Sequence, residues 1–215
     1  IDDRERQRLI IMRIMLLLLF VVMAVQTASA AVFRVEGDTL IYNTEDTDGV
    51  DGISFDDEDK LLKILQTHKN IKLITLKSAG GMSNAAMVMA NIIIDAQLDT
   101  HVDKNCSSAC IRLLLAGKKR TATLGAQIGF HRGRWTAENM KDYYHATKDE
   151  NNWSSPFEFA AWVYDDVKKN VYEYSQYLKR RGVADYVAAY SYRLGFEEMW
   201  FMRRDELLSS GILTE

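Results

Sequence analysis

Apolar runs and amphipathic stretches alternate along the first two thirds of the chain. Short runs rich in Val, Ile and Leu predict strands, and longer segments with apolar residues three or four positions apart predict helices. The predicted strands are 32–42, 72–76, 100–102 and 126–131, and the helices that follow the first three are 58–68, 84–96 and 107–116. A sharp turn at Lys104–Asn105 is expected to join the third strand to its helix. The alternation predicts an α/β fold with parallel strands.

The last third of the chain is predicted to be helical. A capping box at Ser155, with Pro156 at the first helical position, begins a long helix that ends at Gly182. A shorter helix is expected over 183–192 and a last turn over 205–210. Between the last predicted strand and the long helix lies a polar insertion, 139–154, and whether it forms a lid stays open at this stage.

The N-terminal region has the pattern of a secretory signal peptide. A basic residue precedes an almost wholly apolar run, Ile14–Val25, and small residues at Ala28 and Ala30 suit a cleavage site. The run is much shorter than the roughly 20 residues of a membrane-spanning helix. We expect cleavage after Ala30 and a single domain, 31–215, in the periplasm or outside the cell. Retention as an uncleaved membrane anchor stays open, as does whether the extension before Met12 belongs to the natural protein.

Charge and histidine spacing narrow the classes of partner. Without residues 1–30 the chain keeps 23 basic and 27 acidic residues, a net charge of −4, and it has no Lys/Arg stripe with interleaved aromatic residues. This pattern argues against a nucleic-acid binder. The four histidines lack the short spacing of a metal site, so neither a metal nor a cofactor is expected: they are His68, His101, His131 and His145.

Three local features place chemical groups at the ends of predicted strands, where open α/β sheets collect ligands. Gly80 and Gly81 predict a turn whose N–H groups can approach a carbonyl oxygen, as an oxyanion hole requires. Ser107 and Ser108 stand where a strand gives way to a helix, and His131 ends the last strand. A serine beside a histidine base is an arrangement that activates the hydroxyl for acyl transfer.

Each feature also has a structural interpretation. A Gly–Gly pair between strand and helix is often only a turn. A serine at such a junction often caps the helix, and a lone histidine at a strand end is often structural. From the residues alone these interpretations stay open.

Cys106 and Cys110 are the only cysteines, and they flank the two serines. Export would place them in an oxidising compartment, where they could pair and lock the turn. Two small buried thiols are the alternative, since an i, i+4 pair in a regular helix lies near the upper distance limit for a disulfide.

Taken in order, these motifs resemble those of the ClpP/crotonase superfamily. The series is Leu76–Gly81, Cys106–Cys110, Ala116–Gly117 with Arg120, and Ile128–His131. More narrowly, the chain is similar to the exported ClpP-class proteins of bacteria, which typically carry a Gly–Gly turn, a Cys-x-Ser-Ala-Cys segment and a strand that ends in His. The resemblance spans roughly 72–131 and implies a repeated ββα spiral, here with a helical C-terminal part. It also implies assembly into homo-oligomers, because family members often form rings or stacked trimers.

The resemblance implies a role for each matched residue. Ser108 corresponds to the nucleophile and His131 to the general base, while the N–H groups of Gly81 and Ala109 correspond to the oxyanion hole. Ser107 is the less favoured nucleophile. The family's third catalytic residue is an aspartate, and by counting back from Gly211 its place falls near Met199 in this chain. The adjacent Glu198 is the candidate for a shifted carboxylate.

The predicted function is therefore an exported serine hydrolase of peptidase type that acts on a peptide or another acyl substrate. Met199 at the place of the acid supports an alternative, a non-catalytic envelope protein that keeps the fold and binds a partner. A crotonase-type acyl-CoA enzyme is a third interpretation, weakened because export would separate it from the usual CoA pool.

Overall fold

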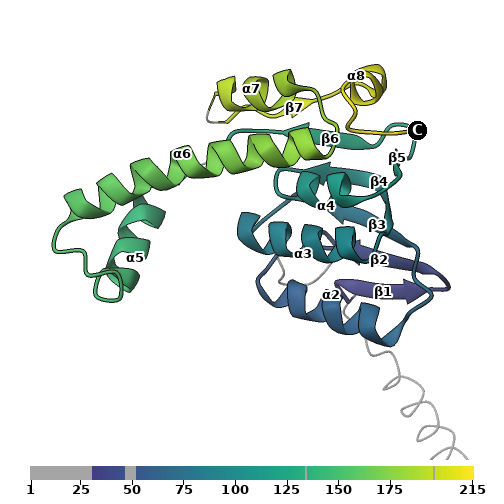
Figure 1. Cartoon of the computed structure of the whole chain (residues 1–215), viewed down its shortest axis with the longest axis horizontal. Helices are drawn as coiled ribbons and strands as arrows, with labels where there is room; N and C mark the ends of the chain where they lie inside the picture. The colour runs from purple at the N-terminus through teal and green to yellow at the C-terminus, as the bar shows by residue number, and fades with distance from the viewer. Residues whose placement is uncertain (1–30, 47–51, 134, 196) are drawn as a thin grey trace, which may run out of the picture. The chain divides into compact units, whose positions relative to one another are not determined.

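A seven-stranded sheet forms the centre of the described residues in the computed structural model (Figure 1). Its order is β1-β2-β3-β4-β6-β7, with β5 beside β4. The strands are β1 (Phe33–Glu36), β2 (Thr39–Asn43), β3 (Leu73–Ser78), β4 (Asp99–Ser107), β5 (Arg120–Ala122), β6 (Gln127–Phe130) and β7 (Trp200–Phe201). The four inner strands β2, β3, β4 and β6 run parallel, whereas β1 and β7 are antiparallel to their neighbours. The carboxyl ends of the parallel strands therefore meet at one edge of the sheet.

The structure describes residues 31–46, 52–133, 135–195 and 197–215, which belong to one unit from Ala31 to Glu215. The predicted signal peptide, 1–30, lies outside the described residues. In the part of the chain that is described, no helix combines the length and apolar character needed to cross a membrane.

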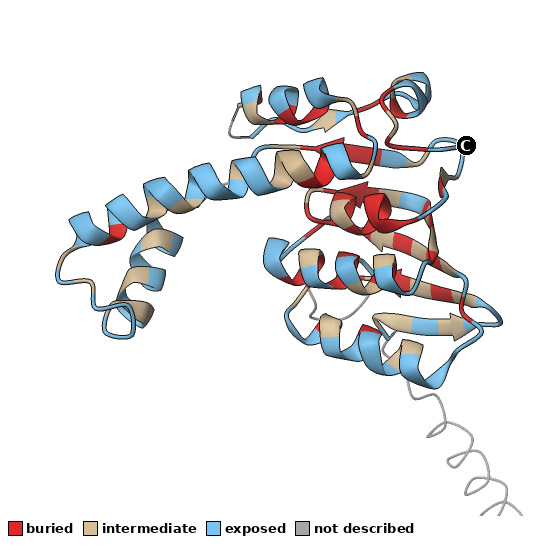
Figure 2. Ribbon diagram, in the orientation of Figure 1, coloured by how far each residue is buried: buried red, intermediate tan, exposed pale blue. Residues whose placement is uncertain are grey.

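Helices cover one face of the sheet. They are α2 (Asp56–Thr67), α3 (Ser83–Asp95) and α4 (Cys110–Ala116), and the later helices are α5 (Ala137–Thr147), α6 (Pro156–Arg180), α7 (Asp185–Arg193) and α8 (Arg204–Ser209). Along β3 the buried residues Ile74, Leu76 and Ser78 alternate with partly exposed ones, so only one face of the strand enters the core. Figure 2 shows buried residues concentrated in the strands and in α4.

Helix α4 is the most deeply buried helix of the fold. Six of its seven residues are buried, among them Ile111, Leu113 and Leu114. Arg112 is the one residue of the helix that is not buried, and each of these large apolar side chains contributes about 1.5–3 kcal/mol on leaving water. The helix that follows Ser108 is therefore firmly anchored.

The path of the chain before α4 differs from the prediction. The turn expected at Lys104–Asn105 is wrong, because β4 continues to Ser107 and α4 begins only at Cys110. Pairing with β6 extends β4, and against β3 the register shifts so that β4 has extra residues. Asp103 and Lys104 bulge there into solvent, which is why they resemble turn residues.

Other boundaries were also only partly predicted. The single strand expected over 32–42 is a hairpin, β1 and β2, that turns at Gly37 with a φ of 64°. Strands β5 and β7 were missed, and the polar segment 139–154 contains much of helix α5. The long helix is confirmed as α6, with the Ser155 side chain accepting a hydrogen bond from the Glu158 N–H.

Candidate active site

The end of β4 and the end of β6 bring a serine and a histidine together. The two strands are paired, with Ser107 opposite Gly129. Ser108 follows β4 and His131 follows β6, and the Ser108 Oγ lies 2.6 Å from the His131 Nε2. The distance is that of a short hydrogen bond, in which the hydroxyl can donate to the imidazole.

Ser108 has a backbone conformation that is rare for a residue with a side chain. Its φ is +56°, in the left-handed region, which costs an L-residue about 1–2 kcal/mol. Its N–H donates to the Gly129 carbonyl at 3.0 Å, and its own carbonyl accepts from the Ile111 N–H at 3.1 Å. The two bonds hold the backbone of Ser108 in a conformation in which its hydroxyl reaches His131, at the end of β6.

The interpretation of Ser107 or Ser108 as a helix cap is wrong. The N-cap residue of α4 is Ala109, and no side chain caps that helix. The Ser107 hydroxyl donates instead to the Asn105 Oδ1 at 2.9 Å, and the Ser108 hydroxyl lies against His131.

The Gly80–Gly81 turn lies directly against the Ser108 turn. The two glycines have φ values of 111° and 140°, which side-chain-bearing residues rarely adopt. A Cβ atom on Gly80 would lie 2.7 Å from the Ser108 Cβ and 3.1 Å from the Ala109 N, and one on Gly81 would overlap the Ile53 backbone. Glycine is therefore required at both positions by the close approach of the backbones.

Hydrogen bonds hold this turn from two sides. The buried Ser78 hydroxyl accepts from the Gly80 N–H at 3.1 Å, while the Ile53 N–H donates to the Gly80 carbonyl at 2.7 Å. The N–H groups of Gly81 and Ala109 donate to none of the described residues. Fixed, unpaired backbone amides are the chemical requirement for stabilising an oxyanion.

The structure does not bring Glu198 to His131. Antiparallel pairing of Phe130 with Trp200 places Met199 at the next position, across from His131. Glu198 is exposed, and its carboxylate accepts from the Gly195 N–H at 2.7 Å. Within the described ranges, no carboxylate is bonded to the imidazole. Among the described residues the arrangement is therefore a Ser–His pair, with Met199 across from the histidine.

Gly129, on β6, makes room for the side chains beside this pair. A Cβ there would lie 2.9 Å from the Met199 Sδ and 2.8 Å from both the Ser107 Oγ and the Phe201 ring. Met199 and Phe201 are 38% and 48% exposed, so an apolar surface adjoins His131 at the solvent boundary.

Cys106 and Cys110 form a disulfide, with their Cα atoms 5.3 Å apart. Both residues are fully buried. The spacing argument from a regular helix did not apply, because Cys106 lies on β4 and only Cys110 lies on α4.

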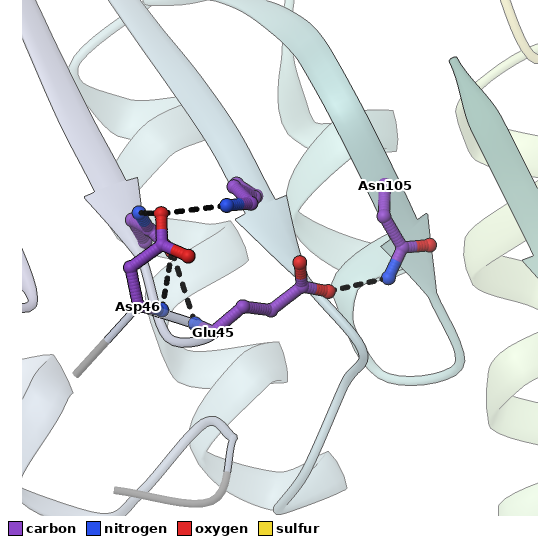
Figure 3. A network of polar contacts seen from close by, with 5 residues as sticks. Glu45, Asp46 and Asn105 are labelled. Carbon is purple, nitrogen blue, oxygen red and sulfur yellow. Dashed lines mark hydrogen bonds and ion pairs between the residues drawn. The ribbon is translucent and has the colours of Figure 1, made fainter. Parts of the chain in front are cut away.

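A polar network lies near the same edge of the sheet, and no sequence motif predicted it (Figure 3). The Asn105 amide donates to the Glu45 carboxylate at 2.5 Å, and Lys77 donates to Asp46 at 2.6 Å. The hydrogen bond from Lys77, followed by that from Asn43, lowers the pKa of Asp46. A hollow of about 430 Å³ borders this network on the face of β1–β4 that the helices leave uncovered.

Comparison with known proteins bears on the fold. No protein-family model and no curated protein matches the chain. Among solved structures, a mutant of ClpP1 from Listeria monocytogenes is similar with a TM-score of 0.56, over 83% of this chain and 90% of that one. The fold is ClpP-like. The predicted α/β class and its helical C-terminal part are thereby confirmed.

Sequence identity to that ClpP1 is 13%, so the similarity concerns the ClpP-like fold alone. The fold alone does not determine the activity, because one fold supports many activities.

Proposed function

We propose that this protein is a serine hydrolase of peptidase type that acts by acyl transfer through Ser108 and His131. The observation that carries the proposal is the 2.6 Å contact between the Ser108 Oγ and the His131 Nε2 beside the Gly80–Gly81 turn. Ser108 is a left-handed serine that follows a strand and packs on the Gly80–Gly81 turn, and among the described residues the Gly81 and Ala109 amides beside it have no partner.

The proposed reaction has two acyl-transfer steps. His131 takes the proton of the Ser108 hydroxyl as its oxygen attacks the substrate carbonyl carbon, and the N–H groups of Gly81 and Ala109 stabilise the resulting oxyanion. The protonated imidazole then gives its proton to the leaving amine or alcohol, which leaves an acyl-enzyme. Water, deprotonated by His131, releases the acid and restores the hydroxyl.

Among the described residues no carboxylate is bonded to His131, and this sets the expected rate. A triad that loses its carboxylate loses roughly 10⁴-fold in kcat, while much of the remaining rate comes from the oxyanion hole and positioning. We therefore expect slow turnover, with labelling by reactive acyl-type probes as the more sensitive readout.

Labelling by a fluorophosphonate probe tests the proposal. We expect wild type to be labelled, and Ser108→Ala and His131→Gln to lose labelling. Ser107→Ala is the matched control, since its hydroxyl is bonded to Asn105 and not to the histidine. A wild-type protein that no fluorophosphonate labels, or a Ser108→Ala variant that labels as well as wild type, would remove the enzymatic proposal.

The second candidate is a non-catalytic envelope protein that keeps the fold and binds a partner. Met199 opposite His131 and the engagement of Glu198 with Gly195 favour it. In that case wild type and Ser108→Ala behave alike with every acyl probe, and a panel of peptidase and esterase substrates shows no turnover.

Export remains part of the proposal. The signal peptide pattern before Ala31 supports it, and the buried disulfide is of a kind that persists in oxidising compartments. Expression of the full chain in a bacterium, followed by fractionation and N-terminal sequencing, should give a periplasmic or secreted protein that starts at Ala31. A full-length cytoplasmic product would contradict this.

Homo-oligomer formation is proposed from the exposed apolar side chains of α6. Phe157 is 85% exposed, Tyr164 68% and Val167 53%. Light scattering coupled to size exclusion should give a mass of several copies, and a Tyr164→Ser/Val167→Ser variant should shift it toward the monomer.

A further inference from the structure

The geometry points to the Cys106–Cys110 disulfide as the positioning device that keeps Ser108 in its left-handed conformation, and thereby in reach of His131. This inference rests on the proposed function, in which Ser108 is the nucleophile. Cys106 and Cys110 do not touch the reacting atoms, and they act through the residues between them.

The disulfide spans the turn that carries the hydroxyl. Cys106 is fixed within the sheet, paired with Ser78 of β3 on one side and Ile128 of β6 on the other. Cys110 is the first residue of α4, whose side chains fill the core. The bond therefore joins two rigid parts of the molecule and encloses Ser107, Ser108 and Ala109.

A serine at this position needs its left-handed backbone conformation to be stabilised, whereas a glycine would not. Glycine adopts a positive φ readily, but it has no hydroxyl, so the catalytic position must carry a side chain in a conformation that L-residues populate roughly tenfold less. Two backbone hydrogen bonds oppose relaxation, from the Ser108 N–H to Gly129 and from the Ile111 N–H to the Ser108 carbonyl. The covalent link adds a constraint that water cannot replace.

Burial of the disulfide indicates a permanent structural crosslink rather than a redox switch. Both cysteines are fully buried, so an external thiol cannot attack the disulfide sulfurs unless the turn first opens. The disulfide is therefore expected to persist in the folded protein. It can be removed by substitution of the cysteines, or by refolding in the presence of a dithiol. The dithiol is then oxidised to a cyclic disulfide, and Cys106 and Cys110 are reduced to thiols.

Two readouts on the full chain test the inference. The Cys106→Ala/Cys110→Ala variant is compared with wild type for its rate of fluorophosphonate labelling, with folding checked by circular dichroism. Ile111→Val, a buried change in the next residue of α4, is the matched control for a modest loss of packing that keeps the disulfide. The second readout is the NMR signal of ¹³Cε1-labelled His131, assigned with His131→Gln. The signal in Ser108→Ala marks the state without the serine–histidine bond.

We expect the double variant to stay folded, to be labelled roughly tenfold more slowly or worse, and to move the His131 signal toward its Ser108→Ala position. Ile111→Val should keep both properties. Labelling within about twofold of wild type together with an unmoved His131 signal would overturn the inference. The inference would also be overturned if neither the double variant nor wild type refolded with dithiothreitol could fold. The disulfide would then be required by the whole fold and not specifically by the Ser108 turn.

Failure of the proposed function has a different signature. If wild type is never labelled, the hydrolase proposal is lost, but the His131 signal still reports whether the disulfide positions Ser108.

Discussion

The candidate site has a serine half, around Ser108, and a histidine half, around His131, and the surrounding structure constrains the first much more than the second. The serine half has the disulfide, the glycine turn packed on Ser108, and a helix of which six in seven residues are buried. The histidine half ends a strand of four residues, and across from His131 lies the partly exposed Met199 rather than an acid. The fold thus fixes Ser108 and the amides beside it, and leaves His131 with one polar contact among the described residues, to Ser108.

Under the proposed function, this contrast indicates which contribution to catalysis is best supported by the fold. Preorganised amides stabilise charge in the transition state and need no movement, whereas the acid of a triad acts by orienting the base. If the proposed function is correct, damage to the serine half should be severe, and improvement should be available in the histidine half.

The largest effect is expected for Gly81→Ala. Its Cβ would overlap the Ile53 backbone at a φ of 140°, so the turn and its amide must move. Loss of an oxyanion donor alone costs roughly 10²–10³-fold in kcat, and labelling should fall by at least that factor. Gly133→Ala is the control, because a Cβ there meets no atom within 4 Å. Equal labelling of the two variants would show that the turn has no part in the reaction.

An intermediate effect, in the opposite direction, is expected for Met199→Asp. A carboxylate across from His131 can orient the imidazole, and we expect labelling about tenfold faster than wild type, a fraction of the roughly 10⁴-fold that an acid supplies in a full triad. Met199→Leu, which changes shape without adding charge, should label like wild type. Glu198→Gln should also change the rate by less than about twofold, since that carboxylate is bonded to Gly195. A large loss in Glu198→Gln would restore Glu198 as the third catalytic residue.

The smallest effect concerns the stability of the serine half. The buried Tyr177 hydroxyl donates to the Arg112 carbonyl of α4 at 2.6 Å, so Tyr177→Phe should lower the free energy of unfolding by about 1 kcal/mol. Urea titration monitored by circular dichroism measures this change. Labelling of the folded variant should stay near that of wild type.

Tyr177 should also make the free energy of unfolding depend on pH in the alkaline range. Burial raises the pKa of Tyr177 far above its ordinary value and that of Tyr174 to about 12. Above pH 10 the unfolded chain releases these protons while the folded protein retains them, so stability is complete below about pH 10 and falls as pH rises further. Tyr177→Phe should lessen this fall in urea titrations between pH 9 and 11. An unchanged slope would mean that other groups govern the alkaline loss.

Local signals in the sequence were sufficient for some of these features. The cap at Ser155 and Pro156 located the start of α6, because a helix end is specified by adjacent residues. Ser108 and His131 were paired in advance because the carboxyl ends of neighbouring parallel strands share one edge of the sheet.

Features that depend on distant partners could not be read in this way. The polar run Asp103–Asn105 has turn composition, yet it belongs to a strand because β6 pairs with its end. Strand β7 has two residues, and its pairing with the end of β6 depends on how the C-terminal part returns to the sheet. The left-handed φ of Ser108 has no composition signal, since serine accommodates many backbone conformations.

Gly129 shows how much of the site depends on a missing methyl group. A thioether, an aromatic ring and a hydroxyl, each from a different residue, converge on the volume that an alanine side chain would fill. Any larger residue must therefore displace all three, and the surface offered to a substrate beside the imidazole would change shape even though Gly129 itself contributes no functional group. The shape of the surface beside the imidazole thus depends on a position of β6 that carries no side chain.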